Sequence, residues 1–160
     1  MDHYQKFLNK ALRFLSYRSR SEKEVLDYLQ KKQTPYEIQS PIMDFLKERR
    51  FVNDEEFAIS WIDQRMRVNA KAQRVIEMEL KQKGVSQEVI AKAFLNSQFS
   101  TLNSVSDLDT AKGLVSKKIE RYRHLPKQEL YQKLGGFLGR KGFDWETIKK
   151  AIEFELKSDK

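Results

Sequence analysis

Four carboxylates in the sequence are grouped closely enough to suggest a metal site. Asp54, Glu55 and Glu56 are consecutive and Asp63 follows soon after them, and carboxylate oxygens are ligands for Mg²⁺ and Ca²⁺. Acidic residues at the start of a helix also complement its dipole and cap its free amides. Because an apolar helical stripe begins at Phe57, we interpret the group as a helix start and predict no metal site.

A glycine-rich segment, residues 135–142, has some resemblance to a phosphate-binding loop. Its order of residues is not G-x-x-x-x-G-K-[ST], no strand is expected before it, and it continues a helical apolar stripe. Small residues that let two helices pack closely explain it better, although each glycine inside a helix costs about 1 kcal/mol. We therefore expect no cofactor-binding residues here.

The remaining reactive side chains are few. The chain has no cysteine, and His3 and His124 are its two histidines. Disulfides, thiolate metal sites and a cysteine nucleophile are excluded, and little is left for general-base catalysis. We predict no catalytic residues and a protein that is not an enzyme.

Net charge is the strongest compositional signal. Thirty-one Lys and Arg against 23 Asp and Glu give +8 over 160 residues, which favours an acidic partner, either a polyphosphate or an acidic protein surface. Many of these side chains only keep a surface hydrated. The residues we select as candidate contacts are Arg18, Arg20, Arg65, Arg67, Arg74, Lys81 and Lys83.

The elements that must position these residues are helices. Apolar residues recur at the spacing of one helix face, first over 4–18 and then along the chain, so that nine helices are expected. Six glycines and three prolines are too few for the turns of an all-β protein. No apolar run approaches the roughly 18 residues of a membrane span, and the first residues lack a signal-peptide stretch, so we expect a soluble intracellular protein.

One turn motif is repeated. Residues 83–94 match residues 141–152 with the pattern K-G-apolar-cap-x-E-x-I-x-K-A-apolar, in which glycine ends one helix and Ser or Asp caps the next. A degenerate copy lies at 32–38, where Pro35 is expected to help set the corner. We predict an all-α fold of three tandem three-helix repeats (1–52, 53–98, and 99–160 with its linker) in an elongated, curved superhelix of unspecified hand.

Three further segments resemble the successive signatures of the RecX family, bacterial regulators of the RecA recombinase. They are residues 18–25 before Tyr28 and Leu29, residues 51–58, and residues 80–86. The sequence departs from the family at Gln33 and at Arg49-Arg50, where glycine is usual, and at Asn53, where aspartate is common. These departures affect turns and caps.

The resemblance implies a function. A RecX protein would bind along the groove of the RecA–DNA filament and restrain ATP hydrolysis, strand exchange and the coprotease activity of the SOS response, without a cofactor. It would act as a monomer in the bacterial cytoplasm, in homologous recombination and DNA repair. The seven basic residues are then candidate RecA or DNA contacts, with weak, non-specific affinity for single- and double-stranded DNA.

Two alternatives belong to other functional classes. The first is a sequence-specific DNA-binding protein built of helix-turn-helix-like units, but its recognition helices would expose Glu37, Asp44, Glu48 and Glu88, which suit a phosphate-lined groove poorly. The second is a generic helical-repeat scaffold with no link to RecA or DNA. Phe57, Trp61 and Phe94 fall on apolar stripes and are expected in the core, whereas Trp145 is expected either to seal a junction or to be exposed. The full set of these aromatic residues could otherwise stack on bases.

Overall fold

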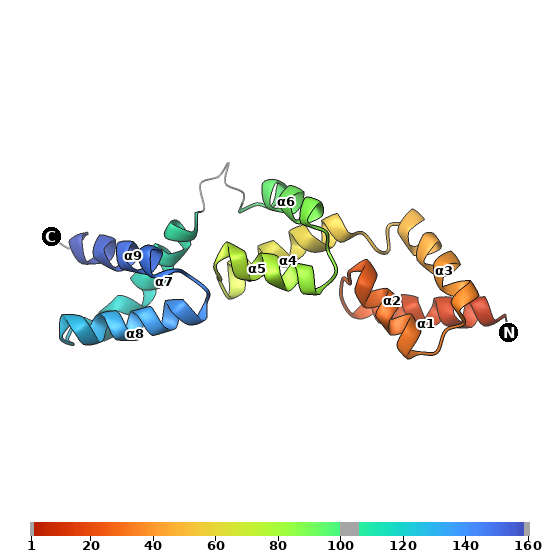
Figure 1. The fold of residues 1–160 in the computed structure, drawn as a ribbon, viewed down its shortest axis with the longest axis horizontal. Helices are drawn as coiled ribbons and strands as arrows, with labels where there is room; N and C mark the ends of the chain where they lie inside the picture. Colours follow the sequence, from red (N-terminus) through yellow and green to blue (C-terminus); the bar gives the residue numbers. More distant parts are fainter. Residues whose placement is uncertain (1, 100–105, 159–160) are drawn as a thin grey trace. The chain divides into compact units, whose positions relative to one another are not determined.

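The structure is a computed structural model that describes residues 2–99 and 106–158. Within these ranges the chain forms nine helices and no strand, which confirms the all-α prediction (Figure 1). The polar linker expected before the third repeat lies largely outside the described residues. The helices are α1 His3–Tyr17, α2 Glu22–Lys31, α3 Tyr36–Glu48, α4 Asp54–Val68, α5 Gln73–Gln82, α6 Gln87–Asn96, α7 Asp107–Tyr122, α8 Lys127–Arg140 and α9 Trp145–Lys157.

The chain divides into two compact units. The first consists of Met1–Trp61 and Glu79–Ala93, and the second of Ile62–Met78 and Phe94–Lys160. None of the helices within the described ranges combines the length and apolar character that crossing a bilayer requires. The limits predicted for three repeats stay a prediction, because the two units are defined by contacts and do not follow those limits.

In the first unit, α1, α2 and α3 all contact one another and enclose an apolar core. The core residues follow the helical periodicity, so each helix buries one stripe. Ser21 begins α2 with the predicted capping box: its hydroxyl accepts from the Glu24 amide, and the Glu24 carboxylate accepts from the Ser21 amide. The buried residues are Phe7, Leu8, Ala11, Val25, Leu29, Ile42, Leu46 and Val52.

In the second unit, α7, α8 and α9 form the corresponding bundle (Figure 1). A capping box begins α7 as well, with Ser106 and Asp109 as the two partners. Ala72, which precedes α5, is buried in the same core and therefore ties that segment to the bundle. The buried residues are Ala72, Ala111, Val115, Ile119, Leu130, Leu134, Leu138, Phe143, Ile148, Ala151 and Ile152.

The corner between the second and third helices has the same backbone form in all three places. Gln33, Gly84 and Gly142 have φ of 57°, 81° and 91°, and the next residue donates to the carbonyl of Leu29, Leu80 and Leu138 respectively. This is the left-handed helix ending that glycine favours. The repeated turn is therefore confirmed for the two glycine copies.

The first copy of the corner has glutamine where the other two have glycine. Gln33 adopts the left-handed conformation at this place. Pro35 occupies the N-cap position of α3 and provides no side-chain hydrogen bond. Arg50, with φ of 57°, is a second left-handed residue without glycine's freedom.

Candidate functional site

The start of α2 is capped by a residue of the next helix group. The Asp54 Oδ1 accepts a hydrogen bond of 2.8 Å from the Glu22 amide. In the second unit the Asp107 Oδ1 accepts one of 2.9 Å from the Gln73 amide at the start of α5. Asp54, at the start of α4, is therefore a helix cap, but the helix that it caps is α2. In α4 itself, the Glu56 amide donates to the side chain of Asn53.

The corners at Gly84 and Gly142 are hydrogen-bonded to residues that precede these two helices, α2 and α5. The Ser21 hydroxyl donates to the Lys83 carbonyl at 2.6 Å, and the Ala72 amide donates to the Lys141 carbonyl at 3.0 Å. Lys83 and Lys141 each precede the left-handed glycine of their corner. The same junction is thus used twice, once inside each compact unit.

Glycine is also required at both corners because a Cβ would clash with a neighbouring side chain. A Cβ added at Gly84 would lie 2.5 Å from the Cβ of Lys23, and one added at Gly142 would lie 2.2 Å from Cγ2 of Val75. Separations this short are excluded by van der Waals repulsion. The two glycines therefore allow each corner to pack directly on a neighbouring helix.

Two of the candidate contact residues, Arg18 and Lys83, are ion-paired to Glu24. The Arg18 guanidinium lies 2.6 Å and the Lys83 ammonium 2.8 Å from Oε1 of Glu24. Burial alone would raise the pKa of Glu24, but hydrogen bonds from Arg18, Lys83 and the Ser21 amide lower it to about 2. Arg18 therefore holds the end of α1 to α2, and Lys83 holds the end of α5 to α2. Part of the charge of both residues is neutralised within the protein.

Arg20 is also engaged inside the first unit. Its guanidinium lies over the Phe14 ring, 4.0 Å from the ring centroid, and its Nε is buried without a hydrogen-bond partner. Burial, followed by the nearby charge of Arg18, lowers the pKa of Arg20. The stacked geometry is that of a cation–π contact.

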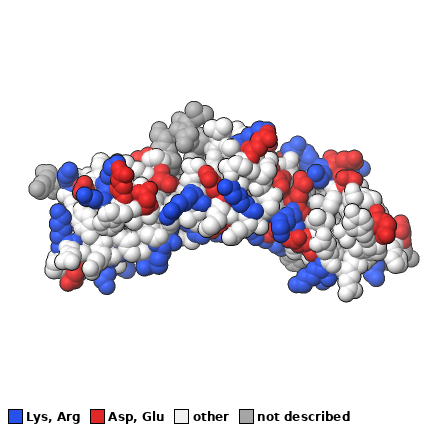
Figure 2. Space-filling model, in the orientation of Figure 1, with Lys and Arg blue, Asp and Glu red and all other residues white. Residues whose placement is uncertain are grey.

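The other four candidates are distributed over both units. Lys81 is exposed in the last turn of α5, in the first unit. Arg65 and Arg67 are in the last turn of α4, and the Arg74 Nε donates to the Gly142 carbonyl at 2.5 Å, all in the second unit. The seven residues are thus divided between the two units, and on the face in Figure 2 basic and acidic side chains are interspersed.

A lysine cluster in the second unit was not selected from the sequence. The ammonium groups of Lys118 and Lys141 lie 3.9 and 5.3 Å from the centroid of the Phe137 ring. Burial, and then the charges of Lys71 and Lys118, lower the pKa of Lys141. Lys141 occupies the place in its corner that Lys83 has in the other. In the sequence, only a comparison of the two copies of the corner motif, residues 83–94 and 141–152, could have indicated Lys141.

The four aromatic residues considered from the sequence differ in their exposure. Phe57 is buried, and Trp61 is half-buried with its Nε1 donating to Glu79 at 2.9 Å. Phe94 is half-buried. Trp145 is 58% exposed, so of the two alternatives left open for it, exposure is the one observed.

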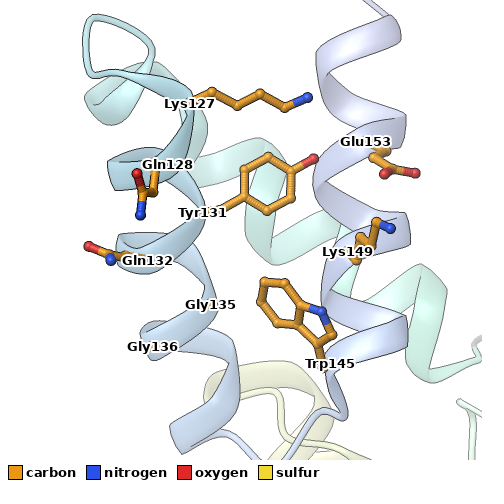
Figure 3. A pocket seen from close by; sticks show the side chains of 9 residues that line it. All are labelled: Lys127, Gln128, Tyr131, Gln132, Gly135, Gly136, Trp145, Lys149 and Glu153. Carbon is orange, nitrogen blue, oxygen red and sulfur yellow. The ribbon is translucent and has the colours of Figure 1, made fainter.

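Trp145 lies in a groove between α8 and α9 that we call the third-bundle groove (Figure 3). Its volume is about 850 Å³. The Tyr131 ring is 6.4 Å from that of Trp145, and Gly135 leaves the space that the indole occupies, since a Cβ there would lie 3.2 Å from it. The lining residues are Lys127, Gln128, Tyr131, Gln132, Gly135, Gly136, Trp145, Lys149 and Glu153.

The groove has the chemistry of a protein-contact surface. An exposed Trp beside a Tyr is typical of residues that dominate binding energy at interfaces. Lys127 and Lys149 at its sides favour an acidic neighbour. The sequence left the role of Trp145 open, and it gave no local signal for Tyr131, which lies one helix earlier.

The sequence also suggested a carboxylate metal site and a phosphate loop, and both segments lie within the described residues. Within the described ranges, no three His, Cys, Asp or Glu residues are grouped so as to hold a metal ion. Residues 135–140 of the glycine-rich segment belong to α8, and the corner follows them. The described residues form helix junctions, a lysine cluster and an aromatic groove.

Within the described ranges, the fold defines an all-helical protein of successive three-helix domains. Sequence profiles of the first, second and third three-helix domains of RecX match residues 8–46, 53–93 and 106–152. The chain belongs to the RecX family.

Relatives and solved structures agree with this assignment. The regulatory protein RecX of Bacillus velezensis is 34% identical over 152 residues, covering 95% of this chain and 56% of the relative. That of Bacillus subtilis is 35% identical over 161 residues, covering 99% and 59%. The chain thus spans somewhat more than half the length of these curated relatives.

Two crystal structures have the same fold. RecX from Lactobacillus salivarius superposes with a TM-score of 0.77 at 27% identity, covering 95% of this chain and 96% of that one. A second structure, of a regulatory protein RecX, gives 0.75 at 28% identity, covering 95% and 74%.

Proposed function

We propose that the chain is a non-enzymatic regulator, mainly an inhibitor, of the RecA recombinase in the bacterial cytoplasm. It binds along the groove of the RecA–DNA filament and restrains ATP hydrolysis, strand exchange and SOS coprotease activity. The observation that carries the proposal is the match of three successive domains to the RecX family, whose curated members are named regulatory proteins.

The distribution of charge supports binding to an acidic filament. The net charge is +8, and exposed cations occur in both units, among them Lys81 in the first and Arg67 in the second. The charges of Lys71 and Lys118, together with burial, lower the pKa of Lys141, so this lysine cluster adds positive potential to the second unit. Phosphate groups or an acidic protein surface could pair with these cations.

The helix-turn-helix alternative is less well supported. The residues exposed on α3 include Glu37, Asp44 and Glu48, and α6 exposes Glu88, which pairs with Lys92 at 3.1 Å. Carboxylates on the helix that should enter the major groove would be repelled by the phosphates beside it. We therefore propose DNA affinity that is weak, non-specific and auxiliary to RecA binding, by a monomer.

Charge reversal tests the contact residues. Reversing Arg18 or Lys83 would break the Glu24 ion pairs, so the informative variant is the double substitution Arg67→Glu with Lys81→Glu. We expect it to weaken inhibition of RecA-driven ATP hydrolysis on single-stranded DNA while leaving helicity unchanged in circular dichroism. Trp145→Ala tests the third-bundle groove in the same assay.

The control makes the same change of charge elsewhere. Lys6→Glu with Lys133→Glu alters two exposed lysines outside the candidate set. We expect inhibition close to that of the unmodified chain. Equal loss in both double variants would mean that net charge, rather than these positions, governs binding, and full inhibition by the first would refute the assignment of Arg67 and Lys81.

A further inference from the structure

A pocket between α1 and α2 is lined entirely by basic and aromatic side chains. Its volume is about 410 Å³, within the range of small-ligand sites. Its lining residues, all described, include no carboxylate. We call it the Tyr17 pocket, and its residues are Lys10, Arg13, Phe14, Tyr17, Tyr28 and Lys32.

The floor of the pocket is a fixed aromatic stack. The rings of Phe14 and Tyr28 are parallel to within 3°, with centroids 4.1 Å apart. The Arg20 guanidinium lies 4.0 Å from the Phe14 centroid, and the Lys32 ammonium 5.5 Å from that of Tyr28. The stack joins α1 to α2 and presents positive charge along a π surface.

Tyr17 is not explained by this packing. Its side chain is 70% exposed in the last turn of α1, whereas Phe14 and Tyr28 are half-buried. An exposed aromatic ring beside three cations can receive a second flat ring while the cations hold attached phosphates. Within α1 the Tyr17 hydroxyl forms a side-chain hydrogen bond with Arg13, which raises the pKa of that guanidinium, and its ring face stays exposed.

A second groove beside α2 has an acidic lining, in contrast to the basic lining of the Tyr17 pocket. A groove between α2 and α3 of about 650 Å³ contains Tyr36, which is 84% exposed. Its lining includes four carboxylates, which would repel a phosphodiester. It therefore provides an exposed tyrosine in the opposite electrostatic setting. The carboxylates are Glu22, Glu37, Asp44 and Asp54.

We propose that the Tyr17 pocket is a binding site for single-stranded nucleic acid. One base stacks on Tyr17, and Lys10, Arg13 and Lys32 contact the phosphates on either side of that base. A duplex fits less well, because its bases are already stacked on one another and expose only their edges. A single strand offers both the free ring faces and the anionic backbone that the lining matches.

This inference deepens the DNA affinity in the proposed function and does not depend on RecA. It is tested on bare oligonucleotides, so its failure would leave the filament experiments untouched. The converse also holds, since a chain that ignores RecA could still bind a strand in this pocket.

Fluorescence anisotropy with the full chain is the direct test. Labelled oligo-dT and oligo-U of about twelve nucleotides are compared with an abasic strand of the same length and with a duplex. We expect Tyr17→Ala to weaken binding of oligo-dT at least about fivefold, and Tyr17→Trp to retain it. The abasic strand should respond to neither substitution. Equal responses of oligo-dT and oligo-U identify the shared single-strand chemistry, and a response of one alone identifies the strand that the pocket prefers.

Matched controls are available on the same helices. Tyr36→Ala removes the exposed tyrosine of the acidic groove, and Lys31→Ala removes the exposed neighbour of Lys32. We expect Lys32→Ala to reduce the slope of log affinity against log salt by about 0.7 and Lys31→Ala to change it less. The proposal is overturned if Tyr17→Ala behaves as Tyr36→Ala does, or if the abasic strand binds as tightly as oligo-dT, which would indicate a purely ionic surface for an acidic protein.

Discussion

Asp54 begins α4 but caps α2, through the 2.8 Å hydrogen bond that its Oδ1 accepts from the Glu22 amide. Asp107 at the start of α7 has the same relationship to Gln73 at the start of α5. Together with the corner carbonyls of Lys83 and Lys141, these bonds satisfy helix-end amides and carbonyls that would otherwise lack partners. The first residue of one helix group thus stabilises the second helix of the group before it.

Removal of this cap should destabilise the first unit. We expect Asp54→Ala to lower the free energy of unfolding by about 1–2 kcal/mol. Asp54→Asn should cost less, because its side-chain oxygen still accepts the Glu22 amide and burial already raises the pKa of the aspartate. Urea unfolding followed by circular dichroism measures both, with exposed Asp44→Ala as the control. Equal losses for Ala and Asn would contradict the capping role.

The Glu24 ion pairs should make the free energy of unfolding depend on pH. The pKa of Glu24 is lowered from 4.5 to about 2, so its contribution is fully present above pH 4.5 and is lost as the pH falls towards 2. The effect is of the order of 2 kcal/mol, reduced by the partial exposure of Arg18. Urea unfolding between pH 6 and 2 should show a shallower acid loss for Glu24→Gln than for the unmodified chain. An unchanged profile would argue against the pairs, and Asp27→Asn is the exposed control.

Glycine should be favourable at the left-handed corner of the first copy. Gln33 has φ of 57°, a conformation that costs a residue with a Cβ about 1 kcal/mol relative to glycine. We expect Gln33→Gly to raise the melting temperature. Gln30→Gly, an exposed position inside α2, should lower it, because glycine there loses helix propensity. A decrease for both would show that Gln33 contributes a contact worth more than its strain.

The glycine at the last corner should tolerate no side chain. Gly142→Ala combines positive φ with a Cβ placed 2.2 Å from Cγ2 of Val75, and we expect a loss of several kcal/mol in stability. Adding Val75→Ala should recover part of it by removing the clash, while the backbone strain remains. Thermal unfolding of the two single variants and the double variant measures the coupling. Strict additivity would contradict close packing at this corner.

Periodicity and capping patterns were sufficient for the helices. The Ser21 and Glu24 pair forms the predicted capping box, and the two corners at Gly84 and Gly142 have the backbone that their shared motif indicated. These features are local, since each depends on residues three to six positions apart. The predicted curvature and repeat limits depend on longer-range geometry, and they stay predictions.

The contacts between helix groups could not be predicted in the same way. Nothing near Asp54 in the sequence indicates that its partner is Glu22, and Arg18 and Lys83 are 65 positions apart although both pair with Glu24. Net charge identified basic residues as candidates without distinguishing those held in internal ion pairs from those left exposed. The Tyr17 pocket could not be predicted from the sequence either, because its lining residues come from α1 and from α2 with its C-cap.

We propose that the chain binds RecA filaments in preference to bare DNA. Co-sedimentation of the purified chain with RecA assembled on single-stranded DNA, with a DNA-only control across a salt titration, tests it most directly. We predict retention on filaments at salt concentrations that remove the chain from bare DNA. Release from filaments and from bare DNA at the same salt concentration would contradict the account.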